Sequence, residues 1–147
     1  MSTTAYLLSD TARLLRRAFD SRMRQLGMTS VQARLLLNLS LNEGENQGFY
    51  AERLEVEPIT LGRLVDRMAE AGLIERRPDP ADRRAWRIHL TECGRLKIDE
   101  SRESLAGLEE QLLHGMSPAQ RTEFAQLLEM IRTNFACARN TEVAVNG

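Results

Sequence analysis

The chain has 147 residues, enough for one domain or for one small domain with an additional oligomerisation element. Its composition, 42% hydrophobic and 28% charged, is typical of a water-soluble globular protein. The net charge of −1 excludes a protein coated with positive charge, but it allows a local basic surface. No apolar run approaches the roughly 20 residues that cross a bilayer, and the N-terminus lacks the pattern of a secretory signal, so we expect a cytoplasmic protein without a membrane segment.

Two helices are expected in the first third of the chain. Apolar residues recur at helical spacing over about residues 5–26, and Gly27 is suited to end this helix. The stretch "TSVQ", residues 29–32, matches a capping box, in which a threonine hydroxyl and a glutamine side chain satisfy free N–H groups at a helix start. The second helix is expected to bury Leu35, Leu36 and Leu39. By composition, "NEGENQG", residues 42–48, is a loop.

A helix-turn-helix unit is predicted next. "FYAERL", residues 49–54, forms a short helix for which Asn46 can act as the cap, and "EVE" forms a three-residue turn. Pro58 suits the first turn of the following helix, because its ring fixes φ and its missing N–H would have had no partner there. Gly72 ends this second helix, which is expected to bury its aliphatic residues and to expose Thr60, Arg63 and Arg67 on the opposite face.

A β-hairpin is predicted after Gly72, because the helical period gives way to two strand-like runs, "LIERR" and "AWRIHLT". Trp86, Ile88 and Leu90 alternate with polar residues in the second run, so we expect Trp86 to pack on the helices. The turn between the runs carries Asp79 and Asp82, which favour turns and can hold arginine side chains in place. Five arginines surround it: Arg76, Arg77, Arg83, Arg84 and Arg87.

Two long helices are predicted at the C-terminal end. One begins near residue 92 and ends before Gly115, and the other follows "SPAQ", residues 117–120, a second capping box. The apolar stripes of the first and last helices exceed what so small a central domain can cover. We therefore expect them to form the interface of a homodimer, with these candidate residues: Leu8, Leu15, Leu112, Leu128, Ile131 and Phe135.

The predicted fold class is mainly α with a small β-hairpin wing: a winged helix-turn-helix domain with N- and C-terminal dimerisation helices. The second helix of such a unit fits the major groove of double-stranded DNA, and an arginine at the wing tip can enter the narrow, negative minor groove. The candidate DNA-binding residues are Thr60, Arg63, Arg67, Arg83 and Arg84. A dimer would recognise a pseudo-palindromic operator.

Other functions are less well supported. A winged-helix module that binds proteins has no need of arginine at both the recognition face and the wing tip. The chain shows no nucleophile–base pair, no glycine-rich phosphate loop and no metal-ligand spacing, so neither an enzyme nor a metal or cofactor is expected. A thiol redox switch stays open as an alternative. Cys93, close to Arg95 and Lys97, is the better candidate for it and Cys137 the other.

Residues 50–94 resemble the central signature of the MarR family of winged-helix transcriptional regulators almost throughout, including the D-x-R-x-x-R pattern as Asp82, Arg84 and Arg87. "LLHGMSPAQ", residues 112–120, further resembles the SlyA-like branch. The resemblance covers nearly the whole chain. It implies a single MarR-type domain, 1–147, with a DNA-binding lobe at 30–94 and dimerisation helices at 5–28 and 95–138.

The resemblance also implies roles for single residues. Arg63 would approach the major groove, Arg84 would be the residue that enters the minor groove, and Asp82 would brace the wing with Arg87 in the same network. It further implies a homodimeric repressor, which a phenolic or other amphipathic small molecule bound between the lobe and the dimer helices would release. Two positions depart from the family pattern: Glu55 occupies a turn position where many relatives have glycine, and Gly62 weakens the recognition helix unless it allows close approach to DNA.

Overall fold

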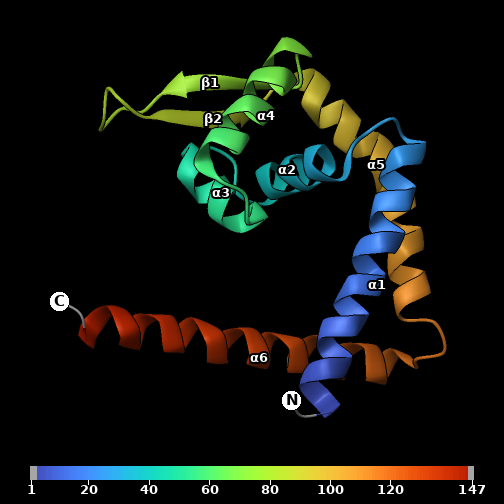
Figure 1. Ribbon diagram of the computed structural model, residues 1–147. Coiled ribbons are helices and arrows are strands. Elements are labelled where there is room, and N and C mark those ends of the chain that lie inside the picture. The colour runs from blue at the N-terminus through green and yellow to red at the C-terminus, as the bar shows by residue number, and fades with distance from the viewer. Residues whose placement is uncertain (1–2, 146–147) are drawn as a thin grey trace. The chain divides into compact units, whose positions relative to one another are not determined.

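The computed structural model describes residues 3–145, with side chains described up to residue 137, and consists there of six helices and one β-hairpin (Figure 1). In chain order these elements are α1 (Thr3–Gln25), α2 (Ser30–Leu41), α3 (Gln47–Leu54), α4 (Pro58–Glu70), β1 (Ile74–Pro78), β2 (Trp86–Leu90), α5 (Glu92–Leu112) and α6 (Pro118–Val145). This order confirms the predicted fold class. The chain divides into two compact units, residues 1–108 and 109–147.

The helix boundaries follow local chemistry. A complete capping box closes the start of α2, where the Thr29 side chain accepts from the Gln32 N–H and the Gln32 side chain accepts from the Thr29 N–H. Asn46 caps α3 by accepting a bond from the Phe49 N–H. Pro58 opens α4, and Gly72 follows its end with a φ of 76°. Each of these features is local in sequence, which is why each was predictable.

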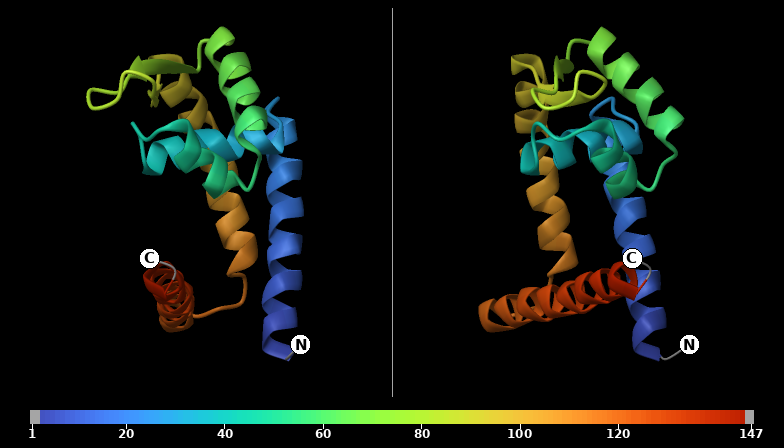
Figure 2. Two further views of the ribbon diagram at one scale, coloured as in Figure 1. Left: turned by 60° about the vertical axis from the view of Figure 1, so that its left-hand side comes forward. Right: turned by 90° about the vertical axis from the view of Figure 1, so that its left-hand side faces the viewer.

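The core of the first unit lies among α2, α3, α4 and the inner face of the hairpin. Leu35, Leu39 and Leu61 are fully buried, as are Tyr50 from α3 and Ile88 from β2. Two views of the ribbon show these helices gathered beside the hairpin, whose turn projects beyond them (Figure 2). The core therefore supports both α4, the predicted recognition helix, and the base of the predicted wing, the β1–β2 hairpin.

The end of α1 is tied to α5 within this unit. The Arg22 guanidinium donates to the Ser104 carbonyl at 3.2 Å, and the Lys97 ammonium donates to the Leu26 carbonyl at 3.1 Å. In the second unit, Arg121 from α6 forms an ion pair with Glu110 at 2.6 Å. The predicted capping box at Ser117 is present there, and it starts α6.

The hairpin is antiparallel and pairs Ile74 with Leu90 at its base and Pro78 with Trp86 towards its tip. A third segment extends this sheet. The Gly44 N–H donates to the Ile88 carbonyl at 2.9 Å, and the Ile88 N–H donates to the Glu45 carbonyl at 3.0 Å. The prediction of a simple loop at 42–48 was therefore incomplete, because residues 44–46 pair with β2 and α3 begins at Gln47.

One further prediction needs correction. Trp86 is 47% exposed rather than packed on the helices. It lies on the same face as Ile88, but about 6.6 Å nearer the tip of the hairpin, whose turn projects beyond the helices (Figure 2). The turn before α4 is made with one residue at positive φ, Glu55, at φ 55° and ψ 44°.

Candidate nucleic-acid interface

One face of α4 carries the predicted recognition residues. Thr60, Arg63 and Arg67 are exposed, whereas Leu61 and Val65 on the opposite face are fully buried. Within the described residues, none of the three exposed side chains forms a hydrogen bond or an ion pair. Their donors are therefore available to an external acceptor.

The start of α4 is open as well. Glu57 occupies the N-cap position without a side-chain hydrogen bond, and the first N–H that reaches back to it belongs to Leu61. The amides of Ile59 and Thr60 precede that bond, so the helix leaves them without an intrahelical partner. Such amides, at the positive end of a helix dipole, favour a phosphate.

The wing arginines are of two kinds, and Arg76 belongs to the structural kind. Its guanidinium donates to the Gln47 side chain at 3.0 Å and to the Gly62 carbonyl at 3.3 Å. It also lies 2.6 Å from an Asp66 carboxylate oxygen. Arg76 therefore joins β1 to α3 and to the middle of α4, and it fixes the base of the wing relative to the recognition helix.

Arg87 is structural too. It donates to the Gly44 carbonyl at 2.9 Å, and its buried Nε atom lies 3.1 Å from an Asp79 carboxylate oxygen, without the alignment of a hydrogen bond. The Ala81 N–H, bound to the other Asp79 oxygen at 2.8 Å, lowers the pKa of Asp79, and the charge of Arg87 lowers it further. Asp79 therefore both shapes the turn and holds Arg87 in place.

The acidic partner of Arg87 is thus Asp79. The family resemblance had implied instead that Arg87 belongs to a network with Asp82. Asp82 braces the wing through the backbone, because its carboxylate accepts a bond from the Arg84 N–H at 2.9 Å. The pattern D-x-R-x-x-R does not reveal this division, since Asp79 lies outside it. The sequence signal for Asp79 was its place in the turn, where it was expected, like Asp82, to hold arginine side chains.

Arg83 and Arg84 are the other kind of wing arginine. Both are exposed, and in the part of the chain that the structure describes their side chains make no hydrogen bond or ion pair. Arg77, by contrast, pairs with Glu75 on its own strand. The wing tip therefore presents two unpaired guanidinium groups on a turn whose backbone is held by Asp79 and Asp82.

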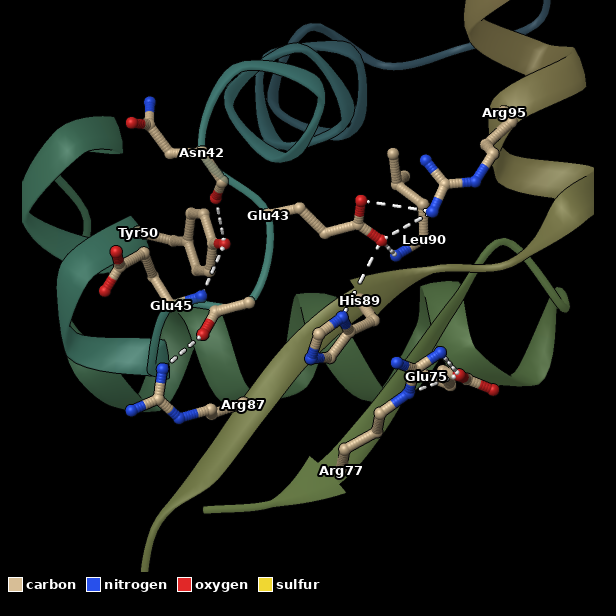
Figure 3. Close-up of polar contacts among 11 residues, drawn as sticks. Asn42, Glu43, Glu45, Tyr50, Glu75, Arg77, Arg87, His89, Leu90 and Arg95 are labelled. Atoms are coloured by element: carbon tan, nitrogen blue, oxygen red, sulfur yellow. Dashed lines mark hydrogen bonds and ion pairs between the residues drawn. The ribbon is translucent and has the colours of Figure 1, made fainter. Parts of the chain in front are cut away.

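A polar network fixes the other side of the wing (Figure 3). The Glu43 carboxylate accepts bonds from the Leu90 N–H at 3.0 Å and from the Arg95 guanidinium at 2.8 Å, and His89 lies 3.7 Å away. Burial alone raises the pKa of Glu43, but the Leu90 N–H and Arg95 outweigh it and hold the pKa below its usual value. The 42–46 segment thereby anchors β2 through side chains as well as backbone.

A separate cavity of about 370 Å³ lies in the first unit, among α1, α2 and α5. Its wall is mostly apolar, with two guanidinium groups and one amide: Ala12, Leu15, Arg16, Phe19, Arg34, Leu37, Asn38 and Leu108. Arg34 also donates to the carbonyl of Leu54, the last residue of α3, at 3.2 Å. Nothing in the sequence pattern singled out Arg34.

The remaining candidate features of the described residues are metal ligands, cysteines and membrane-spanning helices. No group of three or more histidine, cysteine or acidic residues there could hold a metal ion. Cys93 and Cys137 are exposed, and neither forms a disulfide. None of the described helices is long and apolar enough to span a membrane.

Comparison with known proteins agrees with this geometry. Residues 26–85 match the model of the MarR family. A MarR transcriptional regulator from Methanosarcina mazei Go1 is 24% identical and superposes with a TM-score of 0.79, over 90% of this chain and 96% of that chain. The chain has the fold of the MarR transcriptional regulators.

Two further MarR-fold structures are similar to a comparable degree. A MarR-family regulator from Silicibacter pomeroyi is 26% identical with a TM-score of 0.78, over 90% of this chain and 89% of that chain. The transcriptional regulator SlyA is 25% identical with a TM-score of 0.75, over 91% and 94%. SlyA is therefore one neighbour among others, and these similarities do not single out the SlyA-like branch. Proteins of the MarR family are transcriptional regulators and not enzymes.

Proposed function

We propose that this protein is a cytoplasmic, homodimeric MarR-family repressor that binds a specific double-stranded DNA operator and is released by a small molecule. One observation carries the DNA-binding part. Among the described residues of this winged helix-turn-helix fold, the arginines at the recognition face and wing tip have no partner, whereas Arg76 and Arg87 between them are held by internal contacts. Unpaired guanidinium groups at these places suit the phosphates and base edges of DNA.

In this proposal α4 lies in the major groove. Arg63, one turn from the helix start, reads a base edge, while Thr60 and Arg67 flank it and position the helix. Arg83 and Arg84 extend from the wing tip to the adjacent minor groove. The Arg76 contact to Gly62 keeps these two elements at a fixed separation, so both can dock on one DNA half-site.

The dimer is proposed from apolar surface in each unit separately. In α1, Leu8 and Leu15 are 45% and 36% exposed, and Leu112 at the end of α5 is 36% exposed. In α6, Phe135 is 71% exposed, and two partly buried residues continue its stripe: Leu128 and Ile131. Stripes of this kind are normally covered by another subunit. A two-fold dimer would place two recognition helices about 34–36 Å apart, as a pseudo-palindromic operator requires. Within each chain, the two compact units would act together as one MarR-type domain.

The effector site is proposed at the 370 Å³ cavity, whose volume suits a small aromatic molecule. Arg16 and Arg34 on its wall favour an amphipathic molecule with a negative group, such as a phenolate or a carboxylate. Arg34 also holds the Leu54 carbonyl, just before the turn into α4. An anion that draws Arg34 into the cavity would weaken this contact and loosen the position of the recognition helix.

DNA titration tests the proposal. Full-length protein is mixed with its own upstream region, and complex formation is followed by fluorescence anisotropy at several salt concentrations. We expect log K to fall with log [salt] by about 0.9 per neutralised phosphate. Arg63→Ala and Arg84→Ala should each weaken binding about 5- to 150-fold, equivalent to about 1–3 kcal/mol. Arg102→Ala, which removes an exposed arginine of α5 paired with Asp99, is the matched control and should bind normally.

Three further measurements test the remaining parts. Light scattering at micromolar concentration should show a dimer. Benzoate should release DNA from the protein more effectively than its neutral isostere benzamide, and Arg34→Met should remove that difference. Hydrogen peroxide should leave DNA affinity unchanged; peroxide-induced release that Cys93→Ser abolishes would instead support the thiol-switch alternative. A salt-independent, weak association with DNA would contradict the main proposal.

A further inference from the structure

Ile59 is an exposed aliphatic residue in the first turn of the recognition helix. It is 66% exposed, although the other large aliphatic residues of α4 are buried in the core. It follows Pro58 directly, so it lies at the end of the helix that approaches base edges most closely in a helix-turn-helix protein. Charge and hydrogen bonding explain why Thr60, Arg63 and Arg67 are exposed on this helix, but neither explains an exposed isoleucine.

The neighbours of Ile59 on the helix surface form a definite environment. Residues three and four positions further along a helix lie beside it, and here these are Gly62 and Arg63. A Cβ atom added at Gly62 would meet nothing within 4 Å, so this side of α4 is open. Arg63 is exposed and unpaired within the described residues. Ile59 is therefore an apolar surface beside the open space at Gly62 and the Arg63 guanidinium group, which has no partner among the described residues.

The major groove offers one apolar group to such a surface, which is the C5-methyl group of thymine. Side chains four residues apart on a helix are separated by about 6 Å along the axis, or about two base-pair steps of 3.4 Å. From this placement we infer that Ile59 is a specificity residue that packs on a thymine methyl group, one or two base pairs from the base that Arg63 contacts. This inference rests on the proposed DNA binding.

The experiment removes the methyl group alone. Duplexes that bind the full-length protein are first selected from a random library. Each thymine within the half-sites of the best duplex is then replaced by deoxyuridine, which pairs identically and lacks the methyl group. One thymine per half-site should prove sensitive, with a loss of about fourfold per methyl contact, and of about 15-fold when both half-sites are changed.

Variants assign that loss to Ile59. Ile59→Ala should bind the thymine duplex more weakly than wild type and should lose nothing further with deoxyuridine. Arg63→Ala should bind more weakly as well but remain sensitive to deoxyuridine. Leu41→Ala is the matched control, because Leu41 is an exposed aliphatic residue, 79% exposed, at the end of α2. It should behave as wild type on both duplexes.

Each outcome decides the inference. Wild-type binding that is insensitive to deoxyuridine at every thymine would overturn it, even if Ile59→Ala folded poorly. Equal deoxyuridine sensitivity of Ile59→Ala and wild type would overturn it as well. If the protein selects no duplex from the library, the proposed DNA binding itself fails, which is a different result from selecting a duplex whose methyl groups do not matter.

Discussion

Glu55 provides a test of how the helix-turn-helix turn is made. Its backbone is in the left-handed region, at φ 55° and ψ 44°, and it is the only non-glycine residue with positive φ in the described chain. The side chain is exposed and forms no hydrogen bond or ion pair among the described residues. Replacement of Glu55 therefore changes backbone preference and almost nothing else.

The expected gain from Glu55→Gly can be worked out from these facts. A left-handed conformation costs a residue with a Cβ atom about 1–2 kcal/mol, and glycine avoids this cost. Glycine also makes the unfolded chain more flexible, which takes back about 0.5–1 kcal/mol. We expect a net increase of about 0.5–1 kcal/mol in the free energy of unfolding. For a chain of this size, that raises Tm by about 1–4 °C.

Glu55→Ala is the matched control, because it removes the same side chain but keeps a Cβ atom in the strained position. Thermal unfolding followed by circular dichroism, at one protein concentration, should place Glu55→Gly above both wild type and Glu55→Ala. Equal Tm values for the two variants would mean that the turn carries no backbone strain at Glu55, and the reasoning would be wrong.

Three other substitutions have expected outcomes. Asp79→Asn should lower Tm at neutral pH, because it weakens the contact to Arg87. The pKa of Asp79 is lowered in the folded protein, so the difference in Tm between wild type and Asp79→Asn should persist above about pH 4 and disappear as the pH falls through the folded pKa. Asp82→Ala should weaken DNA binding about fivefold in anisotropy titrations, because the Arg84 N–H loses its acceptor. Asp82→Asn keeps an acceptor and should bind at least as tightly as wild type. Weaker binding by Asp82→Asn would show that the charge of Asp82 matters. Gly62→Ala should raise the free energy of unfolding, measured with urea, by about 1 kcal/mol, because the added methyl group meets no neighbour and alanine favours the helix. A loss of stability would show that glycine is needed at this position for folding.

The sequence predicted those parts of the fold that depend on neighbouring residues. The capping box at Thr29, the cap at Asn46 and the proline start of α4 are all encoded within four residues, and the structure confirms them. The exposed face with Arg63 and Arg67 follows from helical periodicity alone. For these features, the same spacing that produced the prediction is also the physical cause of the structure.

The features that were missed depend on contacts between distant parts of the chain. Alternation assigned Trp86 to the same face of β2 as the buried Ile88 but could not show that this end of the strand stays exposed. The pairing of Arg87 with Asp79 rather than Asp82 depends on the shape of the turn. Arg76 contacts α3 and α4 across 29 and 14 residues of sequence, so the sequence alone could not distinguish its structural role from that of the other basic residues. DNA contacts and the dimer interface stay predictions.

The 42–46 segment has a consequence for how this wing can be exchanged between proteins. Loops between helices usually accept insertions, because few of their backbone groups are committed to partners. Here Gly44 and Glu45 both bond to Ile88, across 44 and 43 residues of sequence. One residue inserted between them would break one of these bonds and move the Arg87 contact out of reach. The length of this loop must therefore be inherited together with the hairpin, and a chimera that transplants the wing alone should lose its orientation.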